Sequence, residues 1–296
     1  MENTESKSAS TFGLLRTVSF LLSVILMFGC GTVSDAAEMR LFDLAKKKET
    51  KLAEALPGLQ GKKIVLVGEQ HDQKGHHAAQ LEIIKALHKS GTPVAVALEM
   101  FRTDSQDALD QWVNDRISEK QFQKIYYDNW GFPWALYSMI FDFAREVKIP
   151  LVALNVPRAV TQQVAQGGFK SLSEEQRAGL PFVECRVDPE YMDFIRRAYG
   201  AHGHGQINFT NFCEAQLVWD KAMALHSIAY VKKHPDRTLV LLAGTGHAWK
   251  KGIPERIKER SSTSYAVLLP EIPDHLDKDS VTADDADFLM LGISGK

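Results

Sequence analysis

Two stretches of the chain share one pattern, an unbroken apolar run that ends in Gly-x-x-His. The first covers residues 62–71 and ends at His71, and the second covers residues 238–247 and ends at His247. An apolar run of this kind is typical of a strand that is buried on both faces, because helices cover both sides of the surrounding sheet. The pair therefore predicts an α/β fold in which two central strands each lead into a histidine.

Two further apolar runs also end in a polar residue. Residues 94–98 lead into Glu99, and residues 151–154 lead into Asn155. Helix-like segments separate the runs, so we expect parallel strands whose carboxyl ends meet at one edge, where ligands bind in open α/β sheets. That edge should carry the polar residues that end the four runs, which are His71, Glu99, Asn155 and His247.

Turn-spaced apolar residues predict helices between these strands and a first helix over residues 39–56, ahead of the sheet. The stretch between the strands at Leu151 and Thr238 is helical throughout and is long enough to act as a lid or side wall. The predicted fold class is therefore α/β, with a mostly parallel sheet flanked by helices and a helical insert over the C-terminal edge of the strands.

The N-terminal residues have the features of a targeting segment. Apolar residues 18–28 precede Gly29 and Cys30, and this run is shorter than the ~20 residues that span a bilayer. A small residue before a cysteine resembles the processing site of bacterial lipoproteins. We therefore expect residues 1–30 to be a signal peptide and lipidated Cys30 to anchor the protein in the cell envelope, at the outer membrane. An ordinary cleaved signal or an uncleaved anchor is the alternative.

The rest of the chain divides into three expected parts. Residues 31–60 form a tether and the N-terminal helix, residues 61–270 form the α/β domain, and residues 271–296 form an acidic tail in which only residues 288–291 are apolar enough to pack. The net charge of -2 and the absence of a basic stripe argue against a nucleic-acid partner.

Beyond Cys30, the chain has two cysteines, Cys185 and Cys213, and no CxxC motif. Cysteine-based metal binding is therefore not expected. The two residues could pair in an oxidising compartment, but their separation in sequence does not place them within bridging distance. Buried free thiols are the interpretation that we favour.

The residues at the strand ends suit two kinds of chemistry. Each glycine permits a tight turn that brings its histidine back over the strand end. His71, His247 and Glu99, with one open position, match the ligand set of a catalytic zinc or similar ion. The same side chains, with Glu69, also suit general acid–base chemistry without a metal. Two more histidines open the next helix, and we expect one of them to face the strand ends and the other to face away: His76 and His77.

The helical insert contains further candidate ligands. Tyrosine and histidine both ligate or assist haem, and the insert carries Tyr191, Tyr199, His202 and His204. The two histidines also fit an ordinary surface loop. Arg158, just after Asn155, is suited to contact a propionate or another carboxylate at the strand edge. The aromatic block over residues 126–137 is expected to belong to the core.

Several short motifs occur in a specific order, and together they resemble the ChaN family of haem-binding lipoproteins, which is grouped with the Tiki and erythromycin-esterase-like superfamily. They span about residues 61–269 and include Gly68-Glu69-Gln70-His71, Ala97-Leu98-Glu99-Met100-Phe101, Asn155-Val156-Pro157-Arg158, Trp219-Asp220 and Gly244-Thr245-Gly246-His247.

The resemblance implies an exported iron-uptake protein and a homodimer that holds two haems face to face. It further implies a tyrosine on each iron, with histidine and lysine near the propionates. In Tiki-like members the two Gly-x-x-His histidines and the glutamate form a metal-dependent hydrolase centre. Two functions are therefore expected as alternatives. One is haem binding through a tyrosine of the insert, and the other is hydrolysis with a divalent metal ion at His71, Glu99 and His247, in which Glu99 or Glu69 deprotonates the water.

Overall fold

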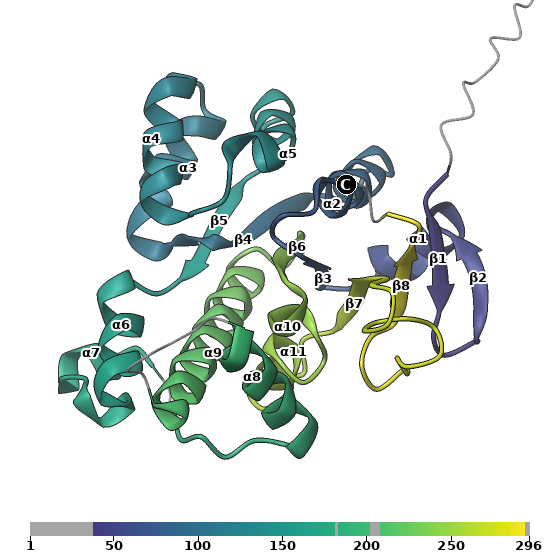
Figure 1. Cartoon of the computed structure of the whole chain (residues 1–296). Helices are drawn as coiled ribbons and strands as arrows, with labels where there is room; N and C mark the ends of the chain where they lie inside the picture. Colours follow the sequence, from purple (N-terminus) through teal and green to yellow (C-terminus); the bar gives the residue numbers. More distant parts are fainter. Residues whose placement is uncertain (1–37, 181–182, 202–207, 294–296) are drawn as a thin grey trace, which may run out of the picture. The chain divides into compact units, whose positions relative to one another are not determined.

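A computed structural model of the chain describes residues 38–180, 183–201 and 208–293. Its centre is an eight-stranded sheet with the order β2-β1-β8-β7-β3-β6-β4-β5 (Figure 1). The α/β prediction is confirmed, because only the two pairings of β1 are antiparallel and every other neighbour is parallel. The strands are β1 (Arg40–Asp43), β2 (Lys48–Lys51), β3 (Ile64–Glu69), β4 (Val94–Arg102), β5 (Leu151–Asn155), β6 (Thr238–Gly244), β7 (Tyr265–Pro270) and β8 (Phe288–Leu291).

Helices cover both faces of this sheet. One face carries α1 (Leu52–Gln60), α2 (Lys74–Lys89), α3 (Gln106–Val113), α4 (Glu119–Asn129) and α5 (Trp134–Glu146). The other carries α9 (Phe209–Lys233), α10 (Thr245–Ala248) and α11 (Ile253–Lys258). Successive side chains of a strand point to opposite faces, so Val65 and Val67 pack with the first group while Ile64 and Leu66 pack with the second. Every residue of β3 and β6 is therefore buried.

The expected helical insert lies between β5 and β6. It contains α6 (Arg158–Gly167), a single 3-10 turn η2 (Phe169–Ser171), α7 (Glu174–Ala178), α8 (Pro189–Ala201) and then α9. The apolar side chains of α6 and α8 form a third cluster against α9. The insert thus has a small core of its own beside the sheet.

The chain order places a topological switch at the centre of the sheet. After β3 the chain passes through α2 on one face to β4, whereas after β6 it passes through α10 and α11 on the other face to β7. β3 and β6 are neighbours, and the chain leaves their carboxyl ends towards opposite faces of the sheet. In open α/β sheets this is the place where a crevice forms for ligands.

The helix expected over residues 39–56 is wrong. These residues form the β1–β2 hairpin followed by the first half of α1, because β8 offers β1 a hydrogen-bonding partner that lies far away in sequence. The hairpin turn is held by Asp43, whose carboxylate accepts from the backbone and side chain of Lys46. The C-terminal stretch, expected to be a tail, likewise contributes β8 to the sheet.

The expectation of free thiols is also wrong. Cys185 and Cys213 form a disulfide, with their Cα atoms 5.6 Å apart. The bond joins the segment before α8 to the start of α9, a proximity created by the tertiary fold of the insert. No helix in the described part of the chain is long and apolar enough to span a membrane.

Candidate functional site

The structure brings His71, Glu99 and His247 together around one glycine at the switch point. Gly244 ends β6 and lies opposite Glu69 of β3. A Cβ atom on Gly244 would lie 2.8 Å from Cε1 of His71 and 3.7 Å from Oε2 of Glu99. The imidazole and the carboxylate therefore occupy the space that a side chain would fill, and His247 follows on α10.

Glu69 organises the first half of this site. Its Oε1 accepts a hydrogen bond from the hydroxyl of Tyr137 at 2.6 Å and lies 2.7 Å from Nδ1 of His71. Its Oε2 lies 2.7 Å from Nδ1 of His77. Burial by itself would raise the pKa of Glu69, but the hydrogen bonds from His71 and His77 outweigh burial and hold that pKa at about 2. Glu69 is thus a carboxylate at neutral and mildly acidic pH.

Asp220 organises the second half. Its Oδ1 lies 2.6 Å from Nδ1 of His247, and its Oδ2 accepts a hydrogen bond from the hydroxyl of Tyr191. Burial would lower the pKa of His247, but the charges of Glu99 and Asp220 raise it to about 9. His247 is therefore charged at neutral pH, and its partner Asp220 is 0% exposed.

Glu99 lies between the two halves. Its Oε2 accepts a hydrogen bond from the backbone N–H of Gly244 at 2.6 Å, and its Oε1 lies 3.7 Å from Nε2 of His247. β4 was expected to end at this residue but continues to Arg102, with a shift of register against β5 between Leu98 and Arg102. Such an irregularity can redirect a side chain, and here it coincides with the carboxylate that faces β6.

Each half has the same order of groups, a tyrosine hydroxyl, a carboxylate and an imidazole. We call Tyr137–Glu69–His71 the first relay and Tyr191–Asp220–His247 the second relay. In both, the carboxylate occupies Nδ1 of the imidazole, so Nε2 is left for chemistry. Burial opposes protonation of His71, but the hydrogen bond to Glu69 and the charge of Glu99 outweigh it and raise its pKa. Both imidazoles can therefore donate or accept a proton beside Glu99.

The geometry of the two relays suits acid–base chemistry. Within the described residues, no group of three or more His, Cys, Asp or Glu side chains is arranged to hold a metal ion. The carboxylates on Nδ1 of His71 and His247 leave both Nε2 atoms available, and one oxygen of Glu99 is bound to the backbone. The expected metal set of His71, Glu99 and His247 gains no support from this arrangement.

His76 and His77 were expected to face in opposite directions, towards the strand ends and away from them, but both are fully buried. His77 contacts Glu69, whereas Nδ1 of His76 accepts the backbone N–H of Gln70 at 3.0 Å. Burial lowers the pKa of His76 to about 4. His76 therefore supports the turn after β3 as a neutral side chain.

A cavity of about 280 Å³ lies next to the two relays, beyond the ends of β4 and β5. Two tryptophans separate it from the relays. Trp130 packs edge-on against His71, with ring centroids 4.9 Å apart, and Trp219 packs edge-on against His247 at 5.9 Å. The other side chains that line it include Met100, Arg102, Tyr127, Asn129, Asn155, Arg158 and Thr161.

The residues expected to bind haem lie in different surroundings. Arg158 lines the cavity, and no carboxylate in the described part of the chain pairs with it. Tyr191 is 1% exposed. Burial, and then the charge of Asp220, raises its pKa well above the ordinary value. The side chain of Tyr199 and both His202 and His204 lie outside the described residues.

Sequence reasoning missed three residues of the site. Tyr137 and Tyr127 were assigned to the core as part of an aromatic block, but Tyr137 completes the first relay and Tyr127 is 53% exposed at the cavity. Asp220 was noticed only as part of a motif. A carboxylate among the buried positions of a long amphipathic helix is the signal that could have identified it, since a buried charge needs a partner.

Comparison with known proteins gives a consistent result. The family model described as "Haem-binding uptake, Tiki superfamily, ChaN" matches residues 55–257. The solved structure described as "Cofacial heme binding to ChaN of Campylobacter jejuni" is similar with a TM-score of 0.68 and 20% identity, over 86% of this chain and 96% of that one.

Two more distant similarities are informative about the fold and a short stretch of sequence. The type III effector HopBA1 is similar with a TM-score of 0.50 and 11% identity, over 79% of this chain and 89% of that one. Protein RETICULATA-RELATED 5, chloroplastic, of Arabidopsis thaliana is 30% identical over 122 residues, which are 39% of this chain and only 16% of that protein. At these identities the structural similarities establish the fold alone.

Proposed function

The chain belongs to the haem-binding uptake family ChaN of the Tiki superfamily, and from this membership we propose that it binds haem at the cavity beyond the ends of β4 and β5. The observation that carries the proposal is the composition of that cavity. It combines an exposed tyrosine, two tryptophans and two arginines at the carboxyl edge of the sheet, where ligands of α/β folds bind.

Tyr127 is the group best suited to ligate the iron. It is the large hydrophobic side chain exposed to solvent in the described part of the chain. Its hydroxyl oxygen accepts the backbone N–H of Trp134 at 3.1 Å, which holds the phenol in place at the cavity. Tyr191 and Tyr199, the tyrosines expected from sequence, remain alternatives, but Tyr191 would first have to leave Asp220.

The two arginines are placed to bind the propionates. Nη1 of Arg102 donates to the carbonyl of Asp128 at 2.8 Å, which holds its guanidinium at the cavity. Arg158, on the first turn of α6, lines the same cavity. Planar guanidinium groups bind carboxylates in a two-point geometry, while Met100, Trp130 and Trp219 supply apolar contact for the porphyrin.

The size of the cavity bears on the partners. At about 280 Å³ it is at the lower limit of the ~300–1,000 Å³ pockets that enclose drug-sized ligands, so a porphyrin would protrude from it. A second copy of the chain could cover the protruding face, which supports the proposal of a homodimer. The Campylobacter ChaN structure is itself described as binding haem cofacially.

We also propose that the protein is an exported lipoprotein of the outer membrane that takes part in haem or iron uptake. The apolar residues 18–28 before Cys30 support this, and so does the Cys185–Cys213 disulfide, since disulfides persist in oxidising compartments. Metabolic labelling with a palmitate analogue tests it. The label should appear in the wild-type protein and be absent from Cys30→Ser.

Titration with haemin, followed by the Soret band, tests haem binding. The wild-type protein should give a saturable Soret band, which Tyr127→Phe should shift and weaken. Tyr191→Phe and Tyr199→Phe should keep the wild-type spectrum if Tyr127 is the ligand. A wild-type protein that gives no Soret band with excess haemin would overturn the proposal.

The two relays support a second candidate function, hydrolysis. A water beside Glu99 could lose its proton to Nε2 of one histidine while the other, charged, histidine protonates the leaving group. The metal-dependent version of this reaction remains the alternative expected from sequence. Ester hydrolysis that is lost in His71→Ala and His247→Ala would support the candidate, and elemental analysis would separate its two versions. No hydrolysis with or without added zinc, manganese or cobalt would exclude it.

A further inference from the structure

The segment before α8, together with the first turn of that helix, is fastened to the rest of the molecule at points close together in sequence. Each fastening joins it to a different partner residue, although two of the partners lie on α9. The fastenings are the Cys185–Cys213 disulfide, the ion pairs of Asp188 and Glu190 with Lys251, and the hydrogen bond from Tyr191 to Asp220. The last of them ends on the carboxylate that holds His247.

Tyr191 forms the cover over that carboxylate. It is 1% exposed, and Asp220 beneath it is fully buried. The helix that carries Tyr191, α8, packs chiefly on α9. α8 belongs to the small cluster of the insert and not to either of the two large clusters on the sheet. α8 therefore lies outside the core of the sheet, and such peripheral elements open more easily than a sheet core does.

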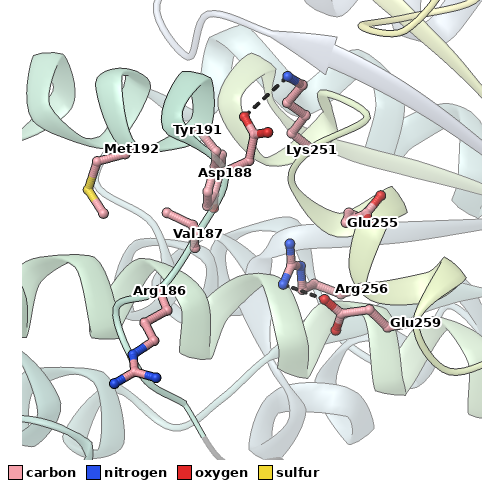
Figure 2. Close-up of a pocket in the computed structure, with 9 residues that line it drawn as sticks. All are labelled: Arg186, Val187, Asp188, Tyr191, Met192, Lys251, Glu255, Arg256 and Glu259. Carbon is pink, nitrogen blue, oxygen red and sulfur yellow. Dashed lines mark hydrogen bonds and ion pairs between the residues drawn. The ribbon is translucent and has the colours of Figure 1, made fainter.

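The two cysteines of the disulfide differ in exposure. Cys213 is fully buried, whereas Cys185 is partly exposed. Next to Cys185, a cavity of about 610 Å³ lies over Tyr191 (Figure 2) and is lined by Arg186, Val187, Asp188, Tyr191, Met192, Lys251, Glu255, Arg256 and Glu259. Figure 2 also shows the Asp188–Lys251 and Arg256–Glu259 pairs among these side chains. Cys185 is therefore the more accessible half of the disulfide.

We propose that the Cys185–Cys213 disulfide is a redox latch that keeps α8 closed over the second relay, with Tyr191 as the positioning residue that covers Asp220. A dithiol opens the latch. One of its thiolates attacks Sγ of Cys185, the S–S bond breaks, and Cys213 leaves as a thiolate that takes up the proton which the reductant gave up to water. The second thiolate of the reductant then attacks the mixed disulfide, so the reductant is oxidised to a disulfide and Cys185 is released as a second thiol.

The latch controls the hydration of the second relay. With the disulfide intact, Tyr191 is held at Asp220 and water is excluded from the carboxylate. With both cysteines reduced, the covalent attachment beside α8 is lost and its noncovalent contacts remain, so its open state is populated more often. The second relay is therefore assembled fully only after the chain has been oxidised, whereas the first relay does not depend on that step.

Hydrogen–deuterium exchange of the full-length, haem-free protein tests the latch. Oxidised protein, protein reduced with dithiothreitol, and the variant Cys185→Ser with Cys213→Ser would be compared. Peptides that cover Pro189–Ala201 should exchange about tenfold faster in the reduced protein and in the double variant. Peptides from β3 and β6 should not change. Tyr191→Phe should accelerate exchange in α8 without reduction, and Tyr126→Phe, which removes another buried tyrosine hydroxyl, should not.

Accessibility of His247 provides the second measurement. Diethylpyrocarbonate should modify His247 faster after reduction, while the rate at His71 stays the same. Dithiothreitol should have no effect on the serine double variant, which controls for Cys30. Unchanged exchange in α8 after reduction would overturn the proposal. So would equal acceleration in β3 and β6, because the disulfide would then stabilise the whole domain instead of one helix.

Discussion

The first and second relays use the same types of group but are assembled in different ways. In the first relay the carboxylate and imidazole are two residues apart in sequence, at the end of β3, and only Tyr137 comes from elsewhere. In the second relay all three groups come from separate helices, α8, α9 and α10. A local pair is positioned by one strand end, whereas a long-range set requires the insert to be folded and closed.

The surroundings of the two carboxylates differ as well. Glu69 has three side-chain partners, and its pKa is about 2. Asp220 has two, and its histidine, His247, has a pKa of about 9. His71 is also the more accessible imidazole, with 29% of its side chain exposed against 12% for His247. The first relay thus combines a firmly held carboxylate with an open imidazole, and the second combines a covered carboxylate with a charged imidazole.

Removing the carboxylate of the first relay should have the largest effect on stability. Glu69→Gln leaves His71, His77 and Tyr137 competing for one neutral amide, so we expect a loss of about 3–5 kcal/mol in the free energy of unfolding. Asp220→Asn should cost less, about 2–3 kcal/mol, because fewer donors lose their partner. Urea denaturation followed by circular dichroism measures both.

The exposed Glu49→Gln serves as the matched control for these variants, since its ion pair with Arg40 lies at the surface and should contribute less than about 1 kcal/mol. Equal losses in Glu69→Gln and Asp220→Asn would show that the two relays are equivalent in stability. The contrast between a local and a long-range relay would then have no energetic meaning.

The two relays should also limit stability at opposite ends of the pH scale. The pKa of Glu69 is lowered from 4.5 to about 2, so its contribution is complete above pH 4.5 and is lost as the pH falls towards 2. The pKa of His247 is raised from 6.5 to about 9, so its contribution is complete below pH 6.5 and is lost as the pH rises through 9. Urea midpoints measured from pH 3 to pH 10 should therefore decline on both sides.

Two variants distinguish the acid decline of the urea midpoint from the alkaline decline. Asp220→Asn should flatten the alkaline decline, while Glu69→Gln should flatten the part of the acid decline below pH 4.5. His76 should add a separate loss of stability on the acid side. Its pKa is lowered from 6.5 to about 4 in the folded protein, so the unfolded chain is protonated at a higher pH than the folded one. His71, whose pKa is raised, contributes to the alkaline side. If the alkaline decline is unchanged in Asp220→Asn, His71 alone accounts for that decline.

The sequence predicted features that local order determines and missed features that depend on long-range contacts. The apolar runs, the α/β class and the meeting of His71, Glu99 and His247 could be predicted, because strand burial and the parallel arrangement place strand ends together. The β1–β2 hairpin could not, since β1 needs β8 as a partner and that strand lies at the other end of the chain. A helical pattern of apolar residues was the only local signal there.

The partners of the histidines were hidden for a similar reason. Glu69 was named as a candidate because it lies beside His71, but the roles of Asp220 and Tyr137 depend on how α9 and α5 pack against the sheet. The disulfide depends on the fold of the insert, and its 28-residue separation carries no information about distance in space. Sequence reasoning therefore recovered the groups held by strand ends and missed those supplied by helices.

Removing the tyrosine hydroxyls should distinguish the relays more finely. Tyr137→Phe and Tyr191→Phe each leave a buried carboxylate oxygen without one donor, which costs about 1.5–3 kcal/mol for a charged acceptor. We expect the loss in Tyr137→Phe to be independent of redox state. In Tyr191→Phe, reduction of the disulfide should add a further loss that is larger than in the wild type. Urea denaturation with and without dithiothreitol measures this, and identical redox effects in the two variants would contradict it.

Gly244→Ala should have the smallest effect on stability and the most selective effect on the site. The backbone of Gly244, with φ −53 and ψ 144, is available to alanine, so no conformational strain is expected. The new methyl group would lie 2.8 Å from Cε1 of His71, and this partly exposed ring can move away at a cost of about 1 kcal/mol. His71 would then leave Glu99, while the Asp220–His247 pair keeps its geometry. Imidazole NMR resonances of the variant should shift for His71 and stay unchanged for His247. Equal shifts at both histidines would mean that the two relays respond as one unit through Glu99, and they would have to be treated as a single network.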